Sequence, residues 1–198
     1  MKQEKTQEHT KKIEESLSYT VEVTDKEGQV IHHVSAPSRS YVQQWNQILN
    51  VQAAQDDKTV KDTGGVDRTV GAHTSNLEIA ATIGVTDRGI RVGKGTTAVA
   101  ITDYALESPC EEGTGTDELN HQIVEFTVPS VVGSTCSFTV RRTMINNTGA
   151  TITGIKEIGA YIFGEVYRCL GFRDVLPSAV YVPHGGSITV TYTIKVTV

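Results

Sequence analysis

The chain has 198 residues and a formal net charge of −5. This mildly acidic balance offers no basic surface to nucleic acid or to anionic lipid, so both kinds of partner are disfavoured. No apolar run approaches the ~20 residues that span a bilayer. The N-terminal sequence MKQEKTQEHTKKIEES also lacks the apolar core of a signal peptide, which predicts a protein made in the cytoplasm.

The first part of the chain predicts a charged arm followed by a β-hairpin. Residues 1–16 alternate charges of both signs and can bury little, so the arm is expected to be helical or disordered. Apolar and polar residues then alternate from Tyr19 to Val23. They alternate again from Val30 to Val34, after a Lys26-Glu27-Gly28 turn, and this pattern is typical of a hairpin.

The segment PSRSYVQQWNQILNVQAAQ changes to the period of an amphipathic helix, with Ser38 or Ser40 as its N-cap. The stripe on one face consists of Tyr41, Trp45, Ile48, Leu49 and Gln52, with Val42 beside it. Such a stripe packs against a sheet or a neighbouring subunit. Its aromatic and aliphatic members are therefore the candidate interaction residues: Tyr41, Trp45, Ile48 and Leu49.

The segment GIRVGKGTTAVAITDYAL, residues 89–106, looks like a phosphate-binding loop around Gly93-Lys94-Gly95-Thr96. That motif needs four residues between its first glycine and its Gly-Lys-Ser/Thr, at the start of a helix. Here only three residues separate Gly89 from Gly93, and the β-branched run that follows favours a strand. We therefore expect a turn between strands over 89–92 and 97–102, and no nucleotide.

Many short strands separated by turn residues follow, and they predict a mainly β fold. The expected ranges are 121–128, 135–145, 151–155, 158–167, 172–175, 179–182 and 187–198. We expect a β-sandwich with jelly-roll-like topology, an N-terminal hairpin and one amphipathic helix. The expected parts are an arm over 1–16, the hairpin and helix over 17–55, and the sandwich domain over 56–198.

The last predicted strand shows the strictest alternation. One face carries Ile188, Val190, Tyr192, Ile194, Val196 and Val198, and the other carries threonines and Lys195. This pattern predicts a strand with one face in the core and one face towards water or a neighbouring subunit.

No convergent catalytic motif is present. The histidines are scattered, and Cys110, Cys136 and Cys169 form no Cys-x-x-Cys pair, so free thiols are expected. The acidic loop over 107–118 suits either a solvated surface or a divalent cation. We expect no enzymatic activity, no cofactor and no catalytic or metal site.

Three segments carry recurring turn and strand punctuation: GIRVGKGTTAVAITDYAL, FTVRRTMINNTGATITGIKEIGAYIF and RDVLPSAVYVPHGGSITVTYTIKV. Together they resemble a group of largely uncharacterised virion structural proteins of tailed bacteriophages. The matching positions include Asp103, Tyr104, Leu106, Asn147 to Ala150, Glu157 to Gly159, and Arg173 to Leu176.

The resemblance implies a structural subunit of a virus particle in the head, neck or tail, located in the virion and in contact with copies of itself and other virion proteins. Two alternatives remain open. One is a carbohydrate- or receptor-binding β-sandwich module, although the aromatic content is only 6%, low for an aromatic binding platform. The other is an extracellular filament subunit that donates its N-terminal strand.

Overall fold

The computed structural model describes residues 14–38 and 40–198. In chain order the elements are β1 (Glu14–Thr24), β2 (Val30–Ser38), α1 (Gln43–Ala54), β3 (Lys58–Lys61), β4 (Asp67–Val70), β5 (Gly89–Gly93), β6 (Asn120–Phe126), β7 (Ser130–Val132), β8 (Thr135–Ile145), β9 (Ile152–Gly164), β10 (Tyr167–Val182) and β11 (Ser187–Thr197).

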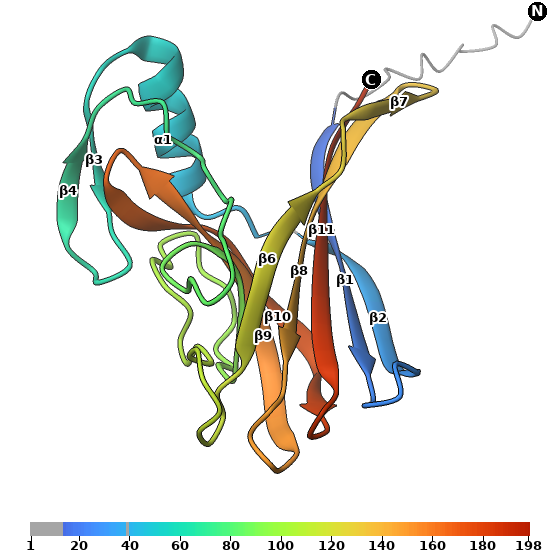
Figure 1. Ribbon diagram of the computed structural model, residues 1–198. Coiled ribbons are helices and arrows are strands. Elements are labelled where there is room, and N and C mark those ends of the chain that lie inside the picture. The colour runs from blue at the N-terminus through green and yellow to red at the C-terminus, as the bar shows by residue number, and fades with distance from the viewer. Residues whose placement is uncertain (1–13, 39) are drawn as a thin grey trace, which may run out of the picture.

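Two antiparallel sheets pack face to face (Figure 1). The larger sheet has the strand order β2-β1-β11-β8-β6, with β7 also paired to β8, and the smaller sheet has the order β10-β9-β5. Strands β3 and β4 form a separate hairpin beside α1. The mainly β architecture, the N-terminal hairpin β1–β2 and the helix are therefore confirmed. The strand order does not confirm a jelly-roll topology.

One hydrophobic core joins the parts of the chain. It takes Val21 from β1, Ile48 from α1 and Ile158 from β9, and all three are fully buried. Between the sheets, the Phe172 ring on β10 meets the Tyr192 ring on β11 at a centroid distance of 4.5 Å. Residues from both predicted parts, 17–55 and 56–198, thus share this core.

Strand β11 lies in the middle of the larger sheet, between β1 and β8. Its first three apolar residues, Ile188, Val190 and Tyr192, are fully buried, as the alternation predicted. The expectation fails beyond them, because Val196 and Val198 are 41% and 55% exposed. Figure 1 shows the reason: the two sheets diverge towards this end, so the smaller sheet no longer covers the face of the larger one.

Three expectations about the strands need correction. Residues 97–102 are an exposed loop and not a strand. The strands predicted over 151–155 and 158–167 form one long strand, β9, and those over 172–175 and 179–182 belong to one long strand, β10. Glu157 looks like a polar interruption in the sequence, but it is fully buried within β9. Strand β1 begins at Glu14 and pairs with β11, so residues 14–16 are neither helical nor disordered; the rest of the predicted arm lies outside the described residues.

The helix begins later than expected, and its buried face differs. Its N-cap is Val42, without a side-chain cap, and the residues buried within it are Gln44, Ile48 and Val51. The hydroxyls of the two predicted caps, Ser38 and Ser40, lie 2.6 Å from each other. Both hydroxyls also hydrogen-bond to the Asp174 carboxylate, so they have partners without capping the helix.

Candidate functional site

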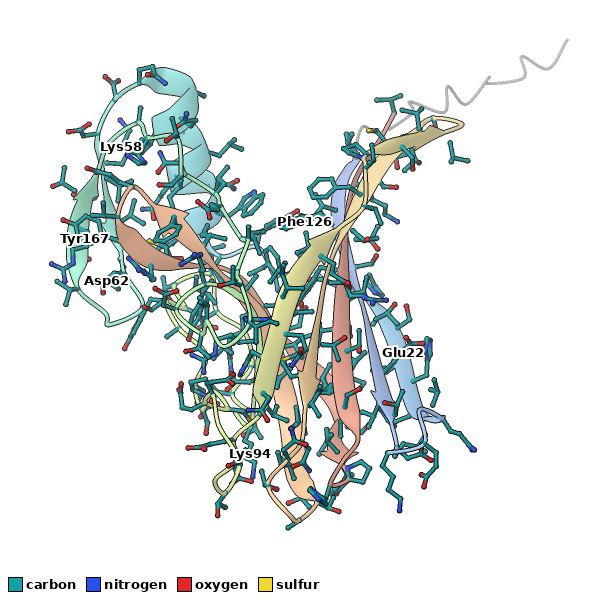
Figure 2. All side chains as sticks on the ribbon, in the orientation of Figure 1. Glu22, Lys58, Asp62, Lys94, Phe126 and Tyr167 are labelled. Carbon is teal, nitrogen blue, oxygen red and sulfur yellow. The ribbon has the colours of Figure 1, made fainter. Side chains whose placement is uncertain are left out.

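An apolar groove lies where the sheets diverge. It has a volume of about 340 Å³ and is lined by Trp45, Leu77, Glu78, Ile79, Ala80, Phe126, Phe138 and Ile194. One wall is therefore the inner face of the larger sheet, and the other comes from α1 and the segment after β4. Figure 2 labels Phe126 at this opening, near the upper end of β6. Glu78 is the only charged residue in this lining, so the groove suits an apolar occupant.

The structure brings two of the four candidate interaction residues, Tyr41 and Trp45, into ring contact. The Tyr41 and Trp45 rings lie 5.0 Å apart, and each ring lies 5.9 Å from that of Phe172. Ile48 is fully buried beneath the helix, whereas Leu49 is 44% exposed and lies outside the buried face. Of the four, Trp45 is the residue that lines the groove.

Beside the groove, the segment 128–135, here called the β7 hairpin, extends the larger sheet. Val128, Val131 and Val132 are 85%, 72% and 78% exposed. Sequence reasoning missed both the hairpin and the groove. A signal existed, since the chain carries no charged residue from Phe126 to Val140 although 21% of all residues are charged. This segment therefore lacks the charges that keep a surface solvated.

A buried ion pair joins two of the three strands of the smaller sheet. Glu157 on β9 is fully buried, and its Oε2 accepts a hydrogen bond of 3.0 Å from Arg173 Nε on β10. The Arg173 Nη1 donates to Asp103 at 2.9 Å, and its Nη2 lies 3.6 Å from a Glu107 oxygen. This arrangement ties the long loop 94–119 to the smaller sheet.

The glycine-rich loop binds a carboxylate of its own chain. The Gly95 amide and the Ser108 amide donate to Glu157 Oε1 at 3.0 and 2.7 Å, and the Glu107 amide donates to Oε2 at 3.0 Å. A Cβ at Gly93 would come within 2.5 Å of the same carboxylate, so glycine is needed there for close approach. The Glu107 carboxylate accepts hydrogen bonds from the Thr96 and Thr97 amides. A strand starting here would need these amides for pairing with a neighbouring strand, so the contact disfavours a strand over 97–102.

Several residues that carry the sequence resemblance meet at this ion pair. Asp103 and Glu157 bind Arg173 directly. A Cβ at Gly159 would lie 3.0 Å from Leu106 and 2.7 Å from the Phe172 carbonyl oxygen. The recurring motifs therefore include residues that fix the loop on the sheet.

Two further ionisable residues are buried near β5. Arg142 is fully buried and donates to the carbonyl oxygens of Gln122 and Val85, among others. Burial lowers its pKa to about 10. His121 is also fully buried, and its Nδ1 lies 2.9 Å from Glu112 Oε2. Burial, followed by the charge of Arg142, lowers the His121 pKa to about 4.

We expect His121 to make stability depend on pH. Between pH 6.5 and about 4 the unfolded chain protonates this histidine while the folded chain does not, so the free energy of unfolding falls as the pH drops. The loss should reach about 3 kcal/mol. Denaturant titrations of wild type and of His121→Asn at several pH values measure it, and the variant should show a flatter profile. An equal slope in both proteins would refute this role.

The carboxylates of the acidic loop point to different partners. Glu111 pairs with Arg91, Asp117 pairs with Lys94, and Glu118 accepts the Gly115 amide. Over residues 14–38 and 40–198, no group of three or more His, Cys, Asp or Glu side chains is arranged to hold a metal ion.

All three cysteines are free thiols, and they differ in accessibility. Cys110 and Cys169 are buried, which raises their pKa values to about 11 and about 12, whereas Cys136 is half-buried. We expect a thiol reagent to modify only Cys136 quickly in dilute native protein, because thiolates react and the other two are neither ionised nor exposed. Rapid modification of two or three thiols before unfolding would contradict this.

Among the described residues, no helix has the length and apolar character required to span a bilayer. In comparisons with known proteins, no family model, curated protein or solved structure matches this chain.

Proposed function

We propose that this protein is a non-enzymatic structural subunit of a virus particle, a capsid, neck or tail component of a tailed phage that acts through self-assembly and contacts with other virion proteins. One observation supports the subunit role: the exposed valines of the β7 hairpin lie beside an apolar groove. Monomeric proteins rarely expose contiguous apolar patches larger than a few hundred Å², and larger patches mark interaction sites. The virion assignment within this proposal rests on the resemblance of the three sequence segments.

The use of the buried ionisable groups supports a structural role. Glu157 and Arg173 bind each other and the loop 94–119, and Asp174 accepts a hydrogen bond from the Tyr192 hydroxyl at 3.0 Å. Burial is the main reason that the Asp174 pKa is raised. These contacts hold strands and loops in place, which is what a rigid subunit requires.

The outer face of the larger sheet gives further support. Threonine hydroxyls on neighbouring strands pair across this face: Thr143 with Thr189 at 2.8 Å and Thr135 with Thr197 at 2.9 Å. These pairs give this face a row of uncharged polar groups, which suits contact with other subunits. A carbohydrate-binding module would instead need a platform of exposed aromatic rings. The exposed aromatic residues of the described chain lie on separate elements, Tyr104 on a loop, Phe126 on β6 and Tyr181 on β10.

Electron microscopy and glycan arrays separate these functions. Concentrated purified protein should form regular rings, tubes or sheets, and it should bind no glycan on an array. Particles purified from a phage that encodes this chain should contain its peptides at the abundance of a structural component. A protein that binds a defined glycan and forms no assembly would overturn the proposal in favour of the binding module.

A further inference from the structure

We propose that the β7 hairpin of one copy occupies the apolar groove of a second copy, and that the second copy returns the same contact about a two-fold axis. This inference rests on the proposed function, because it names the surface through which such a subunit would associate. The two parts of the contact, an apolar ridge and an apolar groove, both belong to the described chain.

The ridge and the groove share one face of the larger sheet. Val131 on β7 lies opposite Cys136 on β8, and Phe138, two residues further along β8, lines the groove. Side chains two residues apart in a strand point to the same face. Val131 therefore continues the apolar surface that Phe138 and Ile194 begin, and on the next strand Val196 continues it as well, opposite Cys136.

The chain does not cover this surface itself. The pairing of β7 with β8 directs the hairpin beyond the groove of its own copy, and its valines remain exposed. Residues 1–13 precede β1 in the sequence and lie outside the described residues. They include four lysines and two glutamates, and Ile13 is their only aliphatic residue besides Met1. Such a segment is too polar to fill an apolar groove, which leaves a second copy as the occupant.

A two-fold axis allows the β7 hairpin and the groove of each copy to be buried in the same contact. The β7 hairpin and the opening between α1 and β6 lie at the same end of the molecule (Figure 1). In a two-fold contact each copy uses the same surface patch. If the hairpin of the first copy enters the groove of the second, the hairpin of the second copy therefore enters the groove of the first. Each dimer then buries two hairpins in two grooves, and no apolar ridge is left to extend the contact into a fibre.

Sedimentation of the full chain with matched variants tests this contact. The Val131→Ser variant should weaken the dissociation constant of self-association by about a hundredfold, because the dimer loses the burial of one valine from each copy. Ala80→Lys, which places a charge in the groove, should have a similar effect. The control is Val30→Ser/Ile31→Ser, which removes two exposed apolar residues at the opposite end of the sheet and should leave association unchanged.

Disulfide trapping tests the geometry. In a Cys136→Ser background, copies carrying Val131→Cys and copies carrying Ala80→Cys should cross-link when mixed and oxidised, and far less when oxidised separately. If wild type associates while the hairpin and groove variants associate equally well, this contact is wrong and the subunit role stands. A wild type that stays monomeric at every concentration overturns both.

Discussion

The Ile188→Asp variant should give insoluble or unfolded protein. Ile188 is fully buried in the central strand β11, opposite Val23 on β1 and Met144 on β8. A carboxylate there would lose its water without gaining a partner, a cost of several kcal/mol. The cavity left by the smaller side chain adds to it. Together these losses approach the ~5–15 kcal/mol net stability of a typical domain.

Thr191→Asp is the matched control on the other face of the same strand. Thr191 lies between Thr20 and the exposed Arg141, so the new carboxylate would face water and a cation. This variant should be soluble, with an unchanged circular dichroism spectrum. Equal tolerance of aspartate at 188 and 191 would show that β11 is not the central core strand.

The second large effect is expected for Glu157→Gln. The Glu157 carboxylate accepts hydrogen bonds from Arg173 and from three amides of the loop 94–119, all in a buried site. Removing its charge leaves Arg173 without its fully buried counter-ion, and only the more exposed Asp103 and Glu107 remain beside it. Breaking a buried pair in this way typically costs about 3–5 kcal/mol. Denaturant unfolding measures the loss, and limited proteolysis should cut the loop sooner than in wild type.

Glu125→Gln provides the comparison for this ion pair. Glu125 on β6 pairs with Arg141 at 2.8 Å on the outer face of the sheet, where both side chains are about half exposed. An exposed pair contributes at most about 1 kcal/mol, so the variant should unfold close to wild type. Equal losses for the two substitutions would mean that the ion pair of Glu157 and Arg173 does not anchor the loop.

Alternation along the chain predicted the strands that face the core on one side only. The range 135–145 agrees with β8, and the alternation of Ile188, Val190 and Tyr192 correctly predicts a buried face. The same period of two also assigns Arg142 to the inner face of β8, between Val140 and Met144. Its burial could therefore have been predicted, but its carbonyl partners come from segments distant in sequence and could not.

Long-range pairing explains the errors. Glu157 looks like a break between strands until Arg173, 16 residues later, neutralises it within the sheet. Residues 97–102 have the composition of a strand, yet two of their amides bind carboxylates, Thr97 that of Glu107 and Ala100 that of Asp103. The sequence identifies Trp45 as a contact residue, but Phe126, Phe138 and Ile194 become one wall of a groove only through the register of three strands.

Sedimentation velocity over a wide range of protein concentration tests the central claim most directly, namely that this protein functions through contacts between copies. The account predicts a reversible shift from monomer to dimer and larger species as the concentration rises. That shift should be largely insensitive to salt, because the β7 hairpin carries no charged residue and the groove lining carries only Glu78. A single monomeric species at all concentrations and salt conditions would contradict it.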